Sequence, residues 1–183
     1  MTAIFLVGAR ASGKTTVGRR LAEELGRPFV DTDLYMKEAL GLTVADIVER
    51  EGWAGFRRWE SEALRAVSVG TRPQVVATGG GMVLAETNRA LMRERGLVFY
   101  LAAPAEALAA RLAADPQAAQ RPNLTGQSLI EEVAQILKER EPLYQAVAHH
   151  QIEATTDLEQ VIAAIVEKIK PEAQHNLKGN LNE

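Results

Sequence analysis

The sequence predicts an α/β fold in which a five-stranded parallel sheet is flanked by helices. Short apolar runs rich in β-branched residues alternate with segments of helical periodicity, and a glycine-rich motif links the first strand to the first helix. The expected strands are Ala3–Val7, Phe29–Asp31, Gln74–Ala77, Leu97–Leu101 and Gln151–Ala154. Right-handed crossovers would then place the loops after the strands along one edge of the sheet, where ligands of such sheets bind.

Helical periodicity occupies most of the chain between these strands. Thr43 is followed three residues later by Asp46, ahead of an apolar run, and this spacing predicts a capped helix start. The segment 171–183 is polar and lacks periodicity, so we expect it to be a disordered tail and assign it no function. The expected helices are Lys14–Leu25, Thr43–Glu51, Trp53–Val67, Glu86–Arg95, Pro104–Ala113, Ser128–His149 and Asp157–Ile169.

Length and composition exclude several classes of protein. The 183 residues fit a single domain, assigned here to residues 1–170, and 46% hydrophobic with 25% charged residues is typical of a soluble globular chain. A net charge of −3 argues against a nucleic-acid partner, and no apolar stretch is long enough to cross a membrane. The absence of cysteine excludes a disulfide scaffold and a thiolate metal site. We expect a cytoplasmic monomer that binds neither nucleic acid nor membrane.

The strongest motif is the segment from Gly8 to Thr15, which matches G-x-x-x-x-G-K-[ST] between an expected strand and an expected helix. The two glycines let the backbone turn and aim its N–H groups at phosphate oxygens. Lys14 would reach the β- and γ-phosphates, and the Thr15 hydroxyl would bind Mg²⁺. A plain glycine turn before an amphipathic helix is the alternative, which this context disfavours. The expected ATP-binding residues here are Gly8, Ala11, Ser12, Gly13, Lys14, Thr15 and Thr16.

Two carboxylates follow the second strand. Asp31 and Asp33 would point to the same side of an extended segment, beside the phosphates. One could hold Mg²⁺ through water while the other accepts a proton from an attacking hydroxyl. Asp33 could equally cap a helix that begins near Leu34, and the residues alone leave both interpretations open.

Further polar groups are candidates for an acceptor site. Three consecutive glycines, Gly79–Gly81, allow a small ligand to approach the backbone closely, although a plain turn would use the same residues. Arg57 and Glu60 share a helix face, for which a surface ion pair is the simpler interpretation. Arg121 lies in a turn-prone segment that would suit a lid closing over phosphate. Arg111 and Arg140, taken alone, resemble ordinary surface charges.

The ordered set of motifs resembles the shikimate kinase family, most closely its type II (enteric) isozymes. The resemblance covers about residues 3 to 169. Two departures are Ala11, where related loops often carry glycine, and Asn123, where many relatives outside type II have leucine. The matching segments are Gly8–Thr16, Phe29–Asp33, Ala54–Arg57 with Glu60, Ala77–Gly81, Arg121–Gly126, and Arg140 with Leu143 and Tyr144.

This resemblance implies a P-loop kinase of the nucleoside-monophosphate-kinase-like type, with a lid at about 112–126 and acceptor-binding helices at about 34–62. The implied reaction is Mg²⁺-dependent transfer of a phosphoryl group from ATP to the 3-hydroxyl of shikimate, a step of aromatic amino acid biosynthesis. The implied catalytic residues are Lys14, Asp33 and Arg121. The remaining implied roles are Mg²⁺ binding by Thr15 and Asp31, adenine contact by Arg111, phosphate contact by Arg121, and shikimate binding by Asp33, Arg57, Glu60, Gly79, Gly80, Gly81 and Arg140.

Two other functions remain to be weighed. A kinase of the same fold that acts on gluconate or a nucleoside monophosphate is the nearer one, and the combination of Arg57 and Glu60 with Gly79–Gly81 disfavours it. A nucleotide-dependent switch protein is the other, since a phosphate loop specifies no output by itself. The sequence lacks the guanine-reading Asn-Lys-x-Asp and an Asp-x-x-Gly after the third strand, which a GTPase-like switch would carry.

Overall fold

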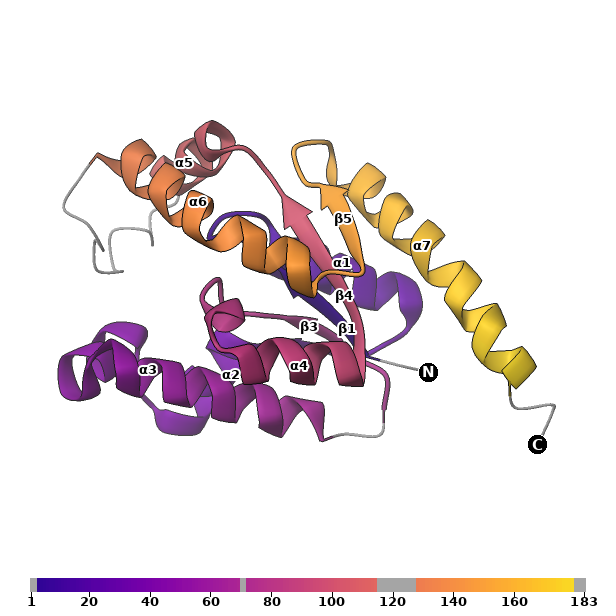
Figure 1. Ribbon diagram of the computed structural model, residues 1–183, viewed down its shortest axis with the longest axis horizontal. Coiled ribbons are helices and arrows are strands. Elements are labelled where there is room, and N and C mark those ends of the chain that lie inside the picture. The colour runs from indigo at the N-terminus through magenta and orange to yellow at the C-terminus, as the bar shows by residue number, and fades with distance from the viewer. Residues whose placement is uncertain (1–2, 70–71, 115–127, 180–183) are drawn as a thin grey trace.

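The computed structural model describes residues 3–69, 72–114 and 128–179, with side chains as far as Ile169. It contains one parallel sheet with the strand order β2-β3-β1-β4-β5 (Figure 1). This confirms the predicted five-stranded α/β architecture, with strand ends shifted by one residue at most. The strands are β1 (Ala3–Val7), β2 (Phe29–Asp31), β3 (Val75–Ala77), β4 (Gly96–Ala102) and β5 (His150–Glu153).

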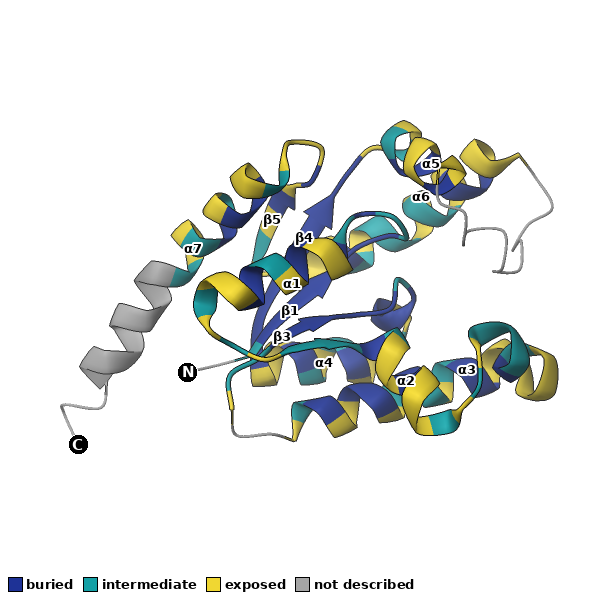
Figure 2. Cartoon of the chain, turned by 180° about the vertical axis from the view of Figure 1, so that it is seen from behind, coloured by how far each residue is buried: buried dark blue, intermediate teal, exposed yellow. Residues whose placement is uncertain are grey.

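Helices cover both faces of the sheet, as Figures 1 and 2 show from opposite sides. The bounds of most helices agree closely with the sequence patterns, and α1 and α4 match them at both ends; α2 is absent from the expected helices, and α7 ends ten residues later than expected. A short 3-10 turn, η1, follows the glycine triplet and was not predicted. The helices are α1 (Lys14–Leu25), α2 (Thr32–Leu40), α3 (Val44–Ser68), η1 (Met82–Leu84), α4 (Glu86–Arg95), α5 (Ala105–Ala113), α6 (Leu129–Val147) and α7 (Leu158–Gly179).

The sheet carries an apolar core on each face. Residues of α1 and α7 pack on one face around Leu6 and Phe99, and residues of α3, α4 and α6 pack on the other around Phe5 and Tyr100. Every residue of β4 is buried, as expected for a parallel strand covered on both sides. This double-sided packing makes the sheet a rigid support for the loops at its carboxyl edge.

The strand register brings three of these loops together. Asp31 at the end of β2 pairs with Ala77 at the end of β3, and Ala77 in turn pairs with Leu6 of β1. The phosphate loop after β1, the carboxylates after β2 and the glycine triplet after β3 therefore leave the sheet side by side.

Helix α3 consists of two helical segments that meet at Gly52. The backbone there has φ 67° and ψ −179°, a conformation that interrupts the helix and favours glycine. The predicted separation into two helices is thus correct, and the Thr43–Asp46 capping box at the start is confirmed. The second segment carries Arg57 and Glu60 towards the sheet edge.

Helix α7 continues past Ile169 to Gly179, so the disorder expected from Pro171 onward is not borne out as far as Gly179. Most residues of this stretch are good helix formers, and extending a helix that already exists costs far less than starting one. In the part of the chain that the structure describes, no helix combines the length and apolar character needed to cross a membrane.

Candidate functional site

The phosphate loop needs both of its flanking glycines. Gly8 has φ 150°, and a Cβ placed on it would lie 2.8 Å from the Leu101 carbonyl oxygen and 2.8 Å from Ser12 Oγ. Gly13, the residue before α1, has φ 91° and lies in the left-handed region. The loop thus closes around a space that the N-terminus of α1 faces, as the motif predicts.

Lys14 is held inside this loop and is only 9% exposed. Its Nζ donates to the carbonyl oxygens of Gly8 at 2.9 Å and Ala9 at 2.7 Å, and to Ser12 Oγ at 3.4 Å. The ammonium group is therefore prepositioned where the motif places phosphate oxygens.

Ala11 has the one positive φ among the described residues other than glycine, at 59°. A left-handed conformation costs an L-residue roughly 1–2 kcal/mol. Arg111 holds this segment from outside, because its Nη1 donates to the Ala11 carbonyl at 3.2 Å and its Nη2 donates to the Ala154 carbonyl at 2.7 Å. Arg111 thereby ties the phosphate loop to the end of β5.

The two carboxylates after β2, those of Asp31 and Asp33, have roles in the structure that differ from the expectation. Asp31 is the N-cap of α2, since its Oδ1 accepts from the backbone N–H groups of Asp33 at 3.0 Å and Leu34 at 3.3 Å. The helix begins at Thr32, so the prediction of an extended segment through Asp33 is wrong, and the capping role belongs to Asp31. Strong N-capping by an aspartate at the strand end explains the early start.

A pair of hard oxygen ligands lies beside the phosphate loop. Thr15 Oγ1 donates to Asp31 Oδ2 at 2.7 Å, which leaves a hydroxyl and a carboxylate oxygen next to each other. Mg²⁺ prefers such oxygens and usually keeps several waters or phosphate oxygens as further ligands. Among the described residues, no three or more His, Cys, Asp or Glu side chains group closely enough to hold a metal ion by themselves.

A cleft of about 700 Å³ opens above these groups. The phosphate-loop segment 10–16 forms one wall, and Asp31, Asp33, Gly80 and Arg111 also line it. Two predicted acceptor residues, Asp33 and Gly80, therefore share this cavity with predicted nucleotide residues, whereas the other predicted acceptor residues, Arg57, Glu60, Gly79, Gly81 and Arg140, do not line it.

Arg57 and Glu60 form a partly buried ion pair, with Glu60 buried and Arg57 28% exposed, rather than the surface pair that was the simpler interpretation. The Glu60 side chain is 2% exposed and accepts from Arg57 Nη1. Burial raises the pKa of Glu60, and the adjacent Arg57 opposes that rise. The Arg57 guanidinium also lies over the rings of Phe56 at 5.3 Å and Trp53 at 5.7 Å, which fix its direction.

The glycine triplet is the surface on which these side chains meet. A Cβ on Gly79 would lie 2.7 Å from Glu60 Oε1 and 2.8 Å from Asp33 Oδ1, so both carboxylates crowd the same point. A Cβ on Gly81 would lie 1.8 Å from Arg57 Nη1. Gly80 and Gly81 do form a turn, closed by the Met82 N–H on the Gly79 carbonyl at 3.0 Å, and the absence of side chains at Gly79 and Gly81 also leaves room for these three groups.

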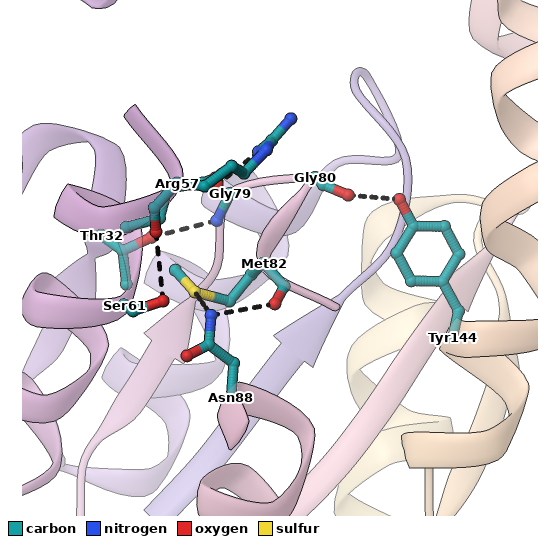
Figure 3. Close-up of polar contacts among 9 residues, drawn as sticks. Thr32, Arg57, Ser61, Gly79, Gly80, Met82, Asn88 and Tyr144 are labelled. Carbon is teal, nitrogen blue, oxygen red and sulfur yellow. Dashed lines mark hydrogen bonds and ion pairs between the residues drawn. The ribbon is translucent and has the colours of Figure 1, made fainter. Parts of the chain in front are cut away.

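Two hydroxyls that the sequence reasoning missed hold the triplet in place (Figure 3). Thr32 Oγ1 accepts from the Gly79 backbone N–H at 3.0 Å, and the Tyr144 hydroxyl donates to the Gly80 carbonyl at 2.6 Å. Tyr144 lies in a segment that matches the family pattern, and this match was the signal that could have identified it. Thr32 likewise lay in a matched segment, Phe29–Asp33, but no role was assigned to it.

Of the remaining predicted arginines, Arg140 lies within the described residues and Arg121 does not. Arg140 lies on α6 one turn before Tyr144, and its charge lowers the pKa of both Tyr144 and Glu60, against the larger effect of burial. Its charge thus acts on two residues, Tyr144 and Glu60, that lie against the glycine triplet. Arg121, Asn123 and most of the expected lid lie in 115–127, outside the described residues.

Comparisons with known proteins point to one family. A family model described as "SKI: Shikimate kinase" matches residues 10–170. "Shikimate kinase 2" of Syntrophotalea carbinolica is 60% identical over 93% of this chain and 98% of its own length. "Shikimate kinase 2" of Dickeya chrysanthemi is 57% identical over 91% and 95%.

Comparisons with solved structures point to the same family. Shikimate kinase from Acinetobacter baumannii in complex with shikimate has a TM-score of 0.87 and 36% identity, over 94% of each chain. A gluconokinase from Sinorhizobium meliloti, with a TM-score of 0.55 and 19% identity over 93% of this chain and 97% of its own, shares the fold alone. The family resemblance seen in the motifs is thereby confirmed.

Proposed function

The chain belongs to the shikimate kinase family, and from this we propose that it transfers the γ-phosphoryl group of ATP to the 3-hydroxyl of shikimate. The products would be shikimate 3-phosphate and ADP. The observation that carries the proposal is the meeting of Asp33, Glu60 and Arg57 on the glycine triplet, next to a phosphate loop. A relative of the same fold has been solved in complex with shikimate, which supports the choice of acceptor.

The phosphate loop supplies the donor side of this reaction. Its backbone N–H groups and the α1 N-terminus bind phosphate oxygens, and Lys14 exchanges its loop carbonyl partners for the β- and γ-phosphates. Because charge builds up on these oxygens during transfer, the lysine stabilises the transition state more than the ground state. Arg111, which already bridges Ala11 and Ala154, contacts the adenine.

Asp33 supplies the general base. The acceptor hydroxyl oxygen forms the new bond to the γ-phosphorus while the bond from that phosphorus to the β,γ-bridging oxygen breaks. Asp33 takes the proton of the hydroxyl, and ADP leaves with the bonding electron pair. Its place in the first turn of α2 supports this role, because Asp31 already caps the helix and Asp33 lines the cleft.

Arginines hold the acceptor. Arg57 and Arg140 bind the shikimate carboxylate, for which planar guanidinium groups are suited because they can donate two parallel hydrogen bonds. Glu60 positions Arg57 through the partly buried ion pair. The lid arginine of the family corresponds to Arg121, which would add charge at the phosphates.

Thr15 and Asp31 would hold Mg²⁺. When bound, the ion neutralises phosphate charge and orients the transferred group. We place the enzyme in the cytoplasm, where its co-substrate ATP is supplied, as a monomer that size-exclusion chromatography with light scattering would verify.

A coupled assay of ADP release tests the proposal. Shikimate, gluconate, AMP and CMP are offered in turn with Mg²⁺ and ATP, and Lys14→Met serves as the control for contaminating kinases. Of the four acceptors, we expect only shikimate to support turnover. In NMR, the phosphorus of the product should couple to the proton on carbon 3 of the shikimate ring. Turnover only with gluconate or with a nucleotide would refute the proposed acceptor, and nucleotide binding without acceptor-stimulated turnover would favour a switch protein.

A further inference from the structure

Tyr144 lies between the core and the acceptor side of the site. Its side chain is almost fully buried, and its ring stacks on that of Tyr100 in β4, with the centroids 5.2 Å apart and 22° between the planes. The hydroxyl reaches the Gly80 carbonyl at 2.6 Å, towards the short end of the range for hydrogen bonds between oxygens. Burial raises the pKa of Tyr144 to about 12, so the phenol keeps the proton that it donates.

Most backbone polar groups of the glycine triplet are engaged within the protein. Within the described part of the chain, no protein group accepts from the N–H of Gly80 or Gly81, so these two donors remain for a ligand. The engaged groups are the Gly79 N–H with Thr32 Oγ1, the Gly79 carbonyl with the Met82 N–H at 3.0 Å, the Gly80 carbonyl with the Tyr144 hydroxyl, and the Gly81 carbonyl with the Leu84 N–H at 3.0 Å.

The Gly80 carbonyl and the Gly81 N–H belong to one peptide unit. No cis peptide bond occurs in the described residues, and in a trans unit the two groups point in opposite directions. The hydrogen bond from Tyr144 therefore directs the Gly81 N–H away from α6. In Figure 3, Arg57 lies on the other side of the triplet from Tyr144, and the Arg57 guanidinium covers the position of a Gly81 Cβ.

Glycine on both sides leaves this peptide unit free to rotate unless something holds it. A residue without Cβ populates positive and negative φ about equally, so rotation of the unit meets little steric resistance. The Tyr144 hydroxyl is the side-chain group that holds its carbonyl. Its loss would let the unit turn without disturbing the packing of the ring on Tyr100.

We propose that Tyr144 is a positioning residue for the acceptor: its hydroxyl holds the Gly80–Gly81 peptide so that the Gly81 N–H, beside Arg57, donates to the anionic group of the acceptor. This inference rests on the proposed function for the identity of that acceptor. Tyr144 contacts neither substrate in this arrangement, and its hydroxyl faces Arg140 as well as the Gly80 carbonyl, so the Gly81 amide resonance is the readout that separates action through the backbone from action through Arg140.

Tyr144→Phe tests the inference, with Tyr100→Phe as the matched control. Both variants remove one hydroxyl from the same stacked, buried pair, but the Tyr100 hydroxyl faces Glu141 at 3.4 Å and does not reach the triplet. A hydrogen bond of this kind contributes about 0.5–1.5 kcal/mol, so we expect the KM for shikimate to rise about 3- to 10-fold in Tyr144→Phe. The KM for ATP and the midpoint of thermal unfolding should match those of Tyr100→Phe. A shikimate KM within twofold of that of Tyr100→Phe would overturn the inference, as would an equal rise in the KM for ATP.

A second readout does not depend on the acceptor. In protein labelled with ¹⁵N-glycine, the amide resonance of Gly81 should shift in Tyr144→Phe and stay in place in Tyr100→Phe. An unchanged Gly81 resonance in Tyr144→Phe would also overturn the inference. If the proposed function fails, the wild-type enzyme shows no turnover with shikimate. If only this inference fails, the wild type turns over shikimate, and Tyr144→Phe leaves the Gly81 resonance and the KM for shikimate unchanged.

Discussion

Replacing Gly81 by alanine should disable the acceptor site while leaving the fold intact. The new Cβ would lie 1.8 Å from Arg57 Nη1, 2.4 Å from its Cζ and 2.6 Å from its Nη2. All three atoms belong to the far end of one flexible side chain, and the backbone of Gly81 has an ordinary negative φ of −94°. The collision is therefore relieved by moving the guanidinium rather than the chain.

The size of the effect follows from the displacement. To reach ordinary contact at 3.4 Å, the guanidinium must retreat by roughly 1.6 Å, more than a hydrogen bond to a bound carboxylate tolerates. A charge-assisted hydrogen bond contributes about 1.5–3 kcal/mol, which corresponds to a rise of about 10- to 100-fold in the KM for shikimate. The KM for ATP should change little, because the phosphate loop is untouched.

Gly80→Ala is the matched control for Gly81→Ala. A Cβ on Gly80 would find its nearest atoms at 3.5 Å, in the backbone of Gly8 and Arg10, so alanine fits there without displacing any group. Steady-state kinetics and thermal unfolding would be measured for both variants. We expect Gly81→Ala to raise the KM for shikimate far more than Gly80→Ala does, with similar unfolding midpoints.

Either of two results would refute this reasoning. If Gly81→Ala bound shikimate as tightly as the wild type, the Arg57 guanidinium would not be an acceptor ligand in the position described. If Gly81→Ala lost its activity together with most of its thermal stability, the added methyl group would be displacing backbone, and the flexible end of Arg57 would not be absorbing the collision.

Three further variants test individual roles. Lys14→Met should lower kcat on the order of 10²- to 10³-fold with an unchanged circular dichroism spectrum, and an active variant would contradict transition-state stabilisation by Lys14. Asp33→Asn should depress kcat while the KM for ATP stays within about twofold of wild type, whereas near-native kcat would exclude Asp33 as the base. Burial raises the pKa of Glu60 from 4.5, so the folded protein binds this proton more tightly than the unfolded chain, and that contribution to stability is lost as pH rises above 4.5. Urea unfolding should therefore show Glu60→Gln gaining stability relative to wild type as pH rises above 4.5, and a difference that stays constant with pH would contradict the raised pKa.

The fold was largely predictable because its signals are local. The continuous apolar run of β4 could only be a strand buried on both faces, and the capping box at Thr43 marks a helix start by two reciprocal hydrogen bonds. The start of α2 was misplaced because Asp31 ends a strand and caps a helix at the same residue. The length of α7 was missed because polar composition was taken for disorder, although Glu172, Ala173, Gln174, Leu177 and Lys178 favour a helix in this stretch.

The site was predictable where a motif carries its own chemistry. Lys14 and Thr15 follow from the loop pattern alone, and the structure places their side chains against the Gly8 carbonyl and Asp31. The burial of Glu60 was not visible, because an Arg–Glu pair three residues apart has the same pattern on a surface helix and in a cleft. The contact of Tyr144 with Gly80 depends on how α6 packs over a distant loop, which no local pattern specifies.

The backbones of the glycine triplet and the phosphate loop lie about one methyl group apart, since a Cβ placed on Gly80 would lie 3.5 Å from the Gly8 carbonyl oxygen and from the Arg10 nitrogen. No side chain separates the two loops there to absorb a shift of either one. We therefore expect a ligand that orders one loop to restrict the other as well, and so to couple the binding of the two substrates. Linkage makes that coupling reciprocal: the factor by which nucleotide tightens acceptor binding equals the factor by which acceptor tightens nucleotide binding.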